Sequence, residues 1–321
     1  QLLNKKYCYI IKGVLFKEKI LLKDKKNAII FSIFAMILWG SAVPLIKSTY
    51  IEFGISQNET GLKILVAGLR FFMAGLLTLF YYKIFTNEKT QYKPLNKKLI
   101  LVLIFTQTMI QYLFYYLGLS NTSGVKSSII QAGNAFMVVI ISALLIPKDK
   151  INPNIIIALI LGTAGVIITS MGGSGENSGM KLTGEGFILI AQVLNALSTV
   201  LVRKYGSGQN PFLLTALPFL LGASGLIIIG LITKEANLAF TGKGFLMLLY
   251  GAFISSTAFS IWTIVLSYHS ANEFSIYKLF IPIFGSILSV IFLGEAFTLR
   301  LLIGMILVLS GSLILNMTRR K

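Results

Sequence analysis

The sequence predicts an all-α integral membrane protein with ten transmembrane helices in two inverted five-helix repeats, and three observations support this. Of the 321 residues, 55% are hydrophobic and only 12% are charged, about half the charged fraction of a soluble domain. Ten separate apolar runs approach the length of about 20 residues that crosses a bilayer as a helix. Short motifs of the first half recur in the second half. These features exclude a soluble enzyme, a nucleic-acid-binding domain and a disulfide-rich scaffold.

The apolar runs are bounded by charged residues, glycine or proline, and most of the connections between them are short. They lie at 28–46, 62–82, 99–119, 125–146, 155–171, 185–202, 212–232, 244–267, 272–293 and 299–317. Their apolarity is continuous, whereas a membrane β-strand alternates apolar and polar residues over about 10 positions. The runs therefore predict helices, and the short connections predict a compact bundle.

Lysine and arginine are distributed unevenly among the connections. The chain has 29 of these residues against 11 Asp and Glu, a net charge of +18. If the N-terminus is inside, 20 of the 29 fall on the inner side, 7 fall on the outer side and 2 lie within spans. Because basic loops stay in the cytoplasm, the charge indicates orientation and not nucleic-acid binding. We expect a multi-pass protein of the cytoplasmic membrane with both termini in the cytoplasm.

The segments outside the spans divide the chain further. Residues 1–27 form a basic cytoplasmic tail with eight lysines, which is either a segment on the membrane surface or a solvated one. The first repeat is expected at 28–171, an extracytoplasmic linker at 172–184 and the second repeat at 185–317, followed by a basic tail at 318–321. No small-residue cleavage site follows the first span, so a signal peptide is not expected.

The internal repeat is visible in short matches. Leu119–Gly124 resembles Leu266–Ala271 at an offset of 147. Charged residues recur at similar offsets, Asp149 with Glu295 at 146 and Lys47 with Arg203 at 156. A unit of five helices forces the second unit to enter the membrane from the opposite side, so the repeats are inverted, as in many transporters.

Several motifs carry a resemblance to a known family. In the second half they are Pro282, Phe292-Leu293-Gly294-Glu295, Gly304 and Gly311, and in the first half Trp39-Gly40 and Arg70-Phe71. Together with the inverted repeat, these residues resemble the drug/metabolite transporter superfamily, in particular its EamA-type members. The resemblance covers about 28–317, but in the first half Asn134-Ala135-Phe136 replaces the proline and Ile146-Pro147-Lys148-Asp149 the glutamate turn. It implies a secondary transporter, often an exporter of amino acids or other small metabolites.

Lys278 is the most specific candidate for a binding residue. It lies near the middle of the ninth span, where an ammonium costs about 3 kcal/mol or more unless it faces water or a partner. The functional interpretation is a site for a carboxylate or phosphate of the substrate. The alternative is a structural cation paired with a carbonyl oxygen or with Glu273.

Polar residues at helical spacing are further candidates for substrate binding. Gln131 lies at an offset of 147 from Lys278, so the repeat places these two residues in equivalent positions. On the fourth span Ser127 and Asn134 share a helical face with Gln131, and on the ninth span Ser275 shares a face with Lys278. On the third span Gln107, Gln111 and Tyr115 form a third polar stripe. The three stripes predict a hydrated cavity near the midplane. The alternative is that these side chains join helices by hydrogen bonds.

Other singled-out residues have a structural interpretation. Trp39 is a candidate wall of the cavity, together with Trp262, although both are equally explained by packing. Arg70 is expected to pair with a helix end or a lipid headgroup, and Glu295 to be a helix-terminal carboxylate at the outer face.

The function predicted from these features is alternating-access transport, with export the expected direction, of an amino acid or related organic solute. A flippase for a lipid-linked intermediate on the same fold is the alternative, and a membrane enzyme or a channel is less well supported because acid/base clusters and filter-like segments are lacking. We expect no enzymatic activity, no cofactor, no bound metal and no nucleic-acid partner. The expected partners are a small-molecule solute and membrane lipid, with a homodimer possible.

Overall fold

The computed structural model describes residues 23–86, 91–147, 149, 151–170, 181–269 and 274–319. The side chains of residues 266, 267, 275, 276 and 319 lie outside this description. Most of the predicted tail at 1–27, most of the linker at 172–184, part of the tail at 318–321, and Glu273 also lie outside it. Every regular element in the described ranges is helical, which confirms the predicted fold class.

The helices follow the predicted apolar runs closely. They are α2 Lys25–Glu52, α3 Thr60–Phe85, α4 Lys97–Leu103, η1 Ile104–Met109, α5 Ile110–Ser120, α6 Gly124–Ala132, α7 Asn134–Leu145, α8 Pro153–Ser170, η2 Leu182–Gly186, α9 Phe187–Tyr205, α10 Pro211–Thr233, α11 Gly242–Tyr268, η3 Ser275–Leu279, α13 Phe280–Leu293 and α14 Leu299–Arg319. Some consecutive elements, such as α4, η1 and α5, join end to end into one longer helix. Counted in this way, the described ranges contain nine helices long and apolar enough to cross a membrane and a shorter tenth at Tyr277–Leu293. This number agrees with the ten helices predicted.

Local sequence signals explain where several helices begin and end. The side chain of Asn210 accepts hydrogen bonds from the backbone N–H groups of Phe212 and Leu213 at the start of α10, and Pro211 needs no N–H partner at this position. At the end of α13, Gly294 adopts a left-handed conformation with φ of 64°, which glycine adopts without steric cost. This turn directs the chain into the loop that carries Glu295.

The helix packing has the pseudo-twofold symmetry that the inverted repeat predicts. Helices with the same place in their repeats pack against each other: α3 with α10, α8 with α14, and α6 with α13. Other contacts come in equivalent pairs, α2 with α13 and α9 with α7, and α2 with α11 and α9 with α5. Equivalent helices cross the bundle in opposite directions because each repeat contains five.

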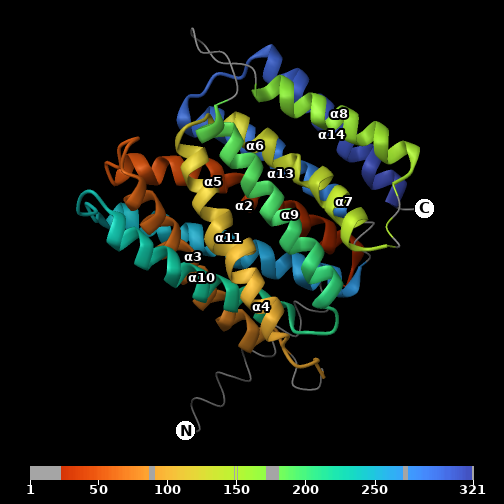
Figure 1. Cartoon of the computed structure of the whole chain (residues 1–321), viewed down its shortest axis with the longest axis horizontal. Helices are drawn as coiled ribbons and strands as arrows, with labels where there is room; N and C mark the ends of the chain where they lie inside the picture. The colour runs from red at the N-terminus through yellow and green to blue at the C-terminus, as the bar shows by residue number, and fades with distance from the viewer. Residues whose placement is uncertain are drawn as a thin grey trace.

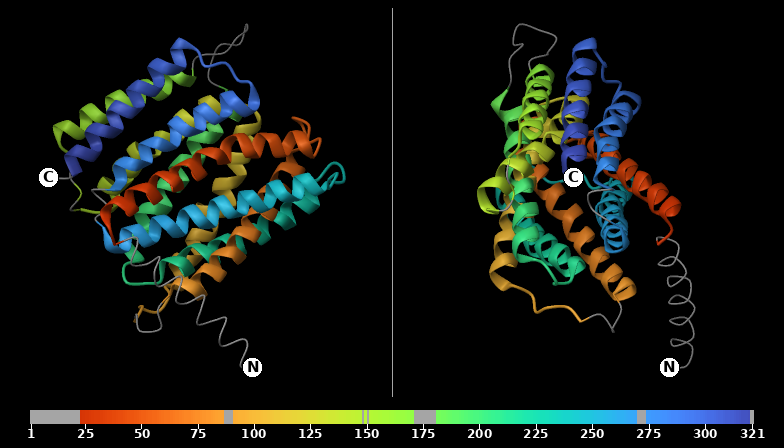
Figure 2. Two further views of the ribbon diagram at one scale, coloured as in Figure 1. Left: turned by 180° about the vertical axis from the view of Figure 1, so that it is seen from behind. Right: turned by 90° about the vertical axis from the view of Figure 1, so that its right-hand side faces the viewer.

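The α8–α14 pair lies along one side of the bundle, and the α3–α10 pair lies towards the opposite side (Figures 1 and 2). In the first pair the two backbones approach closely, because a Cβ atom at Gly165 would lie 2.7 Å from the carbonyl oxygen of Gly304. Small residues permit this kind of contact between membrane helices. These two glycines therefore allow α8 and α14 to pack closely.

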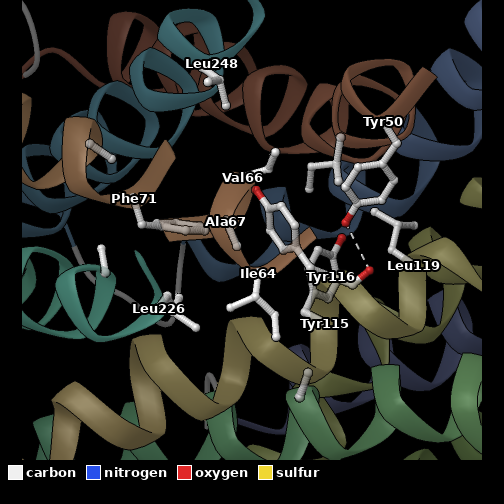
Figure 3. Packing of buried hydrophobic residues seen from close by; sticks show 14 of the residues in the cluster. Tyr50, Ile64, Val66, Ala67, Phe71, Tyr115, Tyr116, Leu119, Leu226 and Leu248 are labelled. Carbon is white, nitrogen blue, oxygen red and sulfur yellow. Dashed lines mark hydrogen bonds between the residues drawn. The ribbon is translucent and has the colours of Figure 1, made fainter. Parts of the chain in front are cut away.

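The interior between these pairs is rich in aromatic residues. Figure 3 shows the side chains of Tyr50, Tyr115 and Tyr116 close together beside α3, with a hydrogen bond from the Tyr50 hydroxyl to the backbone oxygen of Tyr116. This bond is 3.1 Å long, and all three tyrosines are at most 6% exposed. Buried tyrosines usually have a hydrogen-bond partner, so this core has polar groups within it.

Candidate functional site

The two helices at the centre of the pseudosymmetry are both interrupted at equivalent positions. In the first repeat α6 ends at Ala132 and α7 begins at Asn134. In the second repeat the 3₁₀-helical η3 ends at Leu279 and α13 begins at Phe280. Pro282 has no N–H group to bond the carbonyl oxygen of Lys278 four residues earlier. The change of helix type in the second repeat follows from this proline.

The predicted polar stripe of the fourth helix does not continue straight through the break. Gln131 lies before Gly133 and Asn134 after it, and the N–H of Gly133 bonds the carbonyl oxygen of Ile130 at 3.0 Å instead of the oxygen four residues back. The expected common face of Ser127, Gln131 and Asn134 requires an uninterrupted helix. Because the helix is interrupted at Gly133, Gln131 and Asn134 have different neighbours.

Four of the predicted binding residues belong to a network of amide and hydroxyl groups between α5, α6, α7 and α9. Gln131 donates from Nε2 to the hydroxyl of Tyr115 at 2.8 Å. Asn134 donates from Nδ2 to Oδ1 of Asn195 at 3.2 Å, and Asn195 donates to Oε1 of Gln111 at 3.3 Å. We call these five residues the amide network. Asn195 was not predicted as a site residue, because a single asparagine within an apolar run carries no pattern of its own.

Lys278 and Trp39 lie in a second group, on α2, α11 and η3. The ammonium of Lys278 is 5.0 Å from the ring centroid of Trp262, and the rings of Trp262 and Trp39 meet edge to face at 6.3 Å. Lys278 is exposed, whereas Trp262 is only 7% exposed. The ammonium is thus directed towards α11, and a cation over a tryptophan face gains about 0.5–2 kcal/mol. None of the ion pairs between described residues includes Lys278.

No contact among the described residues joins Gln107 to either group, and the side chain of Ser275 is not described. Gln107 lies in the π-helical segment η1 and is half-buried; π-helical turns are frequent at functional sites. The backbone of Ser275 forms part of η3, but its side chain lies outside the described residues. The structure therefore divides the predicted site into the amide network and the Lys278 group.

Arg70 occupies a more central position than expected. It lies near the middle of α3 and is 5% exposed. Its Nη1 donates to the hydroxyl of Tyr116 and its Nη2 to the hydroxyl of Ser255, both at 3.1 Å. The expected partner, a helix end or a lipid headgroup, is therefore replaced by hydroxyl groups of α5 and α11. The reason is that α3 is surrounded by α5, α10 and α11, so its central residues do not reach the membrane surface.

An ion pair joins the two repeats at one face of the bundle. The ammonium of Lys47 on α2 is 2.8 Å from Oε1 of Glu295. The same carboxylate accepts hydrogen bonds from the backbone N–H groups of Gly124 and Val125, at 2.7 and 2.8 Å. Glu295 is a helix-terminal carboxylate, as expected, but it caps α6 of the opposite repeat. We call this end of the bundle the Glu295 face.

The equivalent ion pair lies at the opposite end, which we call the Asp149 face. Arg203 on α9 is 2.5 Å from Asp149, which lies between α7 and α8, and its second guanidinium nitrogen donates to the same carboxylate at 3.0 Å. Arg203 also donates to the hydroxyl of Ser142 at 3.1 Å. Each pair thus connects the first helix of one repeat with the last loop of the other repeat.

These groups suit binding and conformational change better than bond-breaking chemistry. Within the described part of the chain, no three His, Cys, Asp or Glu residues lie close enough to hold a metal ion. Among the described residues, the amide network and the surroundings of Lys278 and Arg70 supply amides, hydroxyls and two cations, which can bind a polar or anionic solute by hydrogen bonds and charge.

Comparison with known proteins identifies relatives that are named as transporters. The chain is 28% identical over 252 residues to an uncharacterized transporter of Archaeoglobus fulgidus, covering 77% of this chain and 86% of that one. It is 25% identical over 301 residues to the uncharacterized transporter YetK of Bacillus subtilis, covering 91% and 87%. It is also 29% identical over 163 residues to the uncharacterized transporter YvbV of Bacillus subtilis, covering 50% of this chain and 53% of that protein.

A solved crystal structure has the same fold, with a TM-score of 0.64 over 92% of this chain and 99% of the other, at 16% identity. The model of the EamA-like transporter family matches twice, at residues 26–171 and 182–317. The two matches cover nearly all of the helices described above. The chain therefore belongs to the EamA-like transporter family.

Proposed function

We propose that this protein is a secondary transporter that moves a small organic solute across the cytoplasmic membrane by alternating access. The observation that carries the proposal is the pair of equivalent ion pairs, Lys47 with Glu295 and Arg203 with Asp149, at opposite ends of the bundle. Each connects the two repeats, so a cavity between the repeats opens to one side only if the tie at that side is released. Exchange of the two repeat conformations then alternates the open side.

In this proposal the solute lies between the two groups of interior side chains. Lys278 binds an anionic group of the solute, because an ammonium within a span requires a counter-charge and none of the described acidic residues pairs with it. The amide network supplies donors and acceptors for the uncharged polar part of the solute. Trp39 forms part of the wall beside Lys278. An amino acid or a related organic acid, exported from the cell, fits these groups.

The orientation in the membrane follows from the distribution of charge. The connections at the Asp149 face, together with the two basic tails expected on the same side, carry most of the lysine and arginine residues, so we assign this face to the cytoplasm by the positive-inside rule. Both termini are then on the cytoplasmic side.

The test compares metabolites released by bacteria that produce the wild-type protein, Lys278→Ala or Lys234→Ala. Lys234 is the matched control, because it is a partly exposed lysine whose ammonium contacts Asn237 outside the interior. We expect the wild type and Lys234→Ala to release the same compounds into the medium. Lys278→Ala should release them at a rate at least about tenfold lower, since a charge-assisted hydrogen bond is worth about 1.5–3 kcal/mol.

Membrane abundance and gel-filtration profile establish that each variant is folded. Full release by folded Lys278→Ala would contradict the role of this residue, and no released compound from the wild type would contradict the transport function. Gln131→Ala should change the relative rates among released compounds, because Gln131 contacts the uncharged part of the solute in this proposal. An unchanged profile would contradict its role.

A further inference from the structure

Arg70 is a buried cation whose charge no acidic residue in the described ranges balances. The four ion pairs in these ranges are Lys47–Glu295, Lys126–Glu185, Arg203–Asp149 and Lys243–Glu52, all at helix ends. Arg70 lies near the middle of α3, and its side-chain hydrogen bonds to other described residues go to two neutral hydroxyls. A guanidinium stays protonated in proteins, so it cannot escape the cost of about 3 kcal/mol or more by losing its charge.

The hydroxyls around Arg70 add hydrogen-bond donors to the guanidinium. The hydroxyl oxygens of Tyr116 and Ser255 both accept a hydrogen bond from Arg70, so each keeps its own proton for donation. No acceptor for either proton lies among the described residues. Nε of Arg70 is also buried without an acceptor. This cluster therefore has several donors, one positive charge and no anion.

Helix α11 contacts the Arg70 cluster at Gly251 and Ser255. A Cβ atom at Gly251 would lie 2.8 Å from Nε of Arg70, so a larger residue there would require the arginine side chain to shift. Gly251 precedes Ser255 by one helical turn, and Trp262 follows Ser255 by seven residues, or two turns. Arg70 and Lys278 therefore contact the same face of α11 at levels about 10 Å apart along its axis.

We propose that Arg70, Tyr116 and Ser255 form a second anion site, which binds a carboxylate group of the transported solute near the midplane. The inference rests on the proposed transport function and adds the class of substrate, namely organic anions with a carboxylate. The planar guanidinium matches the two oxygens of a carboxylate, and the two hydroxyls donate to its remaining lone pairs. Along α11 the solute meets Lys278 at one level and Arg70 at the other.

Only 5% of Arg70 is exposed, so a carboxylate reaches it when the surrounding helices separate. Without the anion, the cluster keeps an uncompensated charge, which costs stability. Removing the charge should therefore stabilise the empty protein and abolish its response to anions. Removal of a purely structural arginine would not have these two effects.

The first experiment measures thermal unfolding of the full-length protein in lipid nanodiscs, with acetate or its neutral analogue acetamide as the probe. The background is Lys278→Met, so that any remaining response to acetate comes from a different site. We expect acetate to raise the unfolding midpoint of Lys278→Met, while acetamide leaves it unchanged. The double variant Lys278→Met/Arg70→Met should have a higher midpoint without acetate and should lose the acetate response.

A lower midpoint of the double variant with an unchanged response to acetate would overturn the proposal. Arg70→Lys in the same background provides a variant that keeps the charge but not the planar donor pair. It should respond to acetate with at least about a threefold weaker apparent affinity. Inorganic phosphate is a further probe, and stabilisation by phosphate in place of acetate would overturn the assignment to carboxylates.

The second experiment uses proteoliposomes loaded with a ¹³C-labelled metabolite extract, with release followed by mass spectrometry. The wild type should release compounds that carry a carboxylate, and Arg70→Met should release them at least about tenfold more slowly. Release of only compounds that lack a carboxylate would overturn the anion site and leave the transport function intact. Release of no labelled compound by the wild type would overturn the transport function itself.

Discussion

The Glu295 face and the Asp149 face are related by the repeat, yet their ion pairs lie in different surroundings. At the Glu295 face the side chains of Lys47 and Glu295 are 22% and 15% exposed. At the Asp149 face the side chains of Arg203 and Asp149 are 56% and 25% exposed. The first carboxylate also accepts two backbone hydrogen bonds from the start of α6, so it is a helix cap as well as a partner of Lys47.

Ion pairs at equivalent positions of the two repeats therefore contribute differently to the stability of the protein. A half-exposed ion pair is screened by water and is worth about 0–1 kcal/mol. A carboxylate that caps a helix and neutralises a partly buried lysine is worth more, because its loss leaves donors without acceptors. We therefore expect the Glu295 face to open less readily than the Asp149 face.

The largest effect is expected from exchange of the two charges at the Glu295 face. In the double variant Lys47→Glu/Glu295→Lys the opposite charges remain, but a lysine now faces the N–H groups of Gly124 and Val125. An ammonium cannot accept their hydrogen bonds, and it is repelled by the positive end of the α6 dipole. The free energy of unfolding in mixed micelles with SDS should fall by about 4 kcal/mol. Stability equal to the wild type would show that only the ion pair matters.

A smaller effect is expected from removal of the carboxylate alone. Glu295→Ala removes the acceptor of Lys47 and of two backbone N–H groups, which should lower the free energy of unfolding by about 3 kcal/mol. Glu295→Gln serves as the control, because its amide oxygen still accepts from the start of α6. It should lose about half as much in the same SDS titration. Equal losses in the two variants would contradict the capping role.

The smallest effect is expected at the Asp149 face. Arg203→Ala removes a half-exposed guanidinium, and the free energy of unfolding should fall by about 1 kcal/mol or less. The loss should shrink further in 0.5 M sodium chloride, because salt screens exposed charges. A loss above about 2 kcal/mol would contradict the difference between the two faces.

Most of the fold follows from the sequence. The run predicted at 62–82 is α3 at Thr60–Phe85, and the run at 212–232 is α10 at Pro211–Thr233. Some runs differ in detail. The third contains the π-helical η1, the fourth is interrupted between α6 and α7, and the ninth, 272–293, contains the 3₁₀ segment η3. Apolar composition does not distinguish 3₁₀ from α-helix, although Pro282 indicates a disturbance nearby.

The site was less accessible to sequence reasoning. Helical spacing identified Gln131 and Gln111 as polar side chains on helix faces, but their partners, Tyr115 and Asn195, come from other helices. Arg70 was expected near a helix end because nothing in its own span shows that α5 and α11 enclose it. The functional roles of all these residues stay predictions until they are tested.

Apolar run length and the recurrence of motifs were enough to predict the helices and the inverted repeat, and the inequality of basic residues between loops predicts an orientation. These properties depend on how each segment interacts with the bilayer, and every segment carries that information locally. The partners of Glu295, Arg70 and Lys278 depend on contacts between segments far apart in the chain. Such contacts arise only when the two repeats pack together, because packing sets which side chains share a buried position.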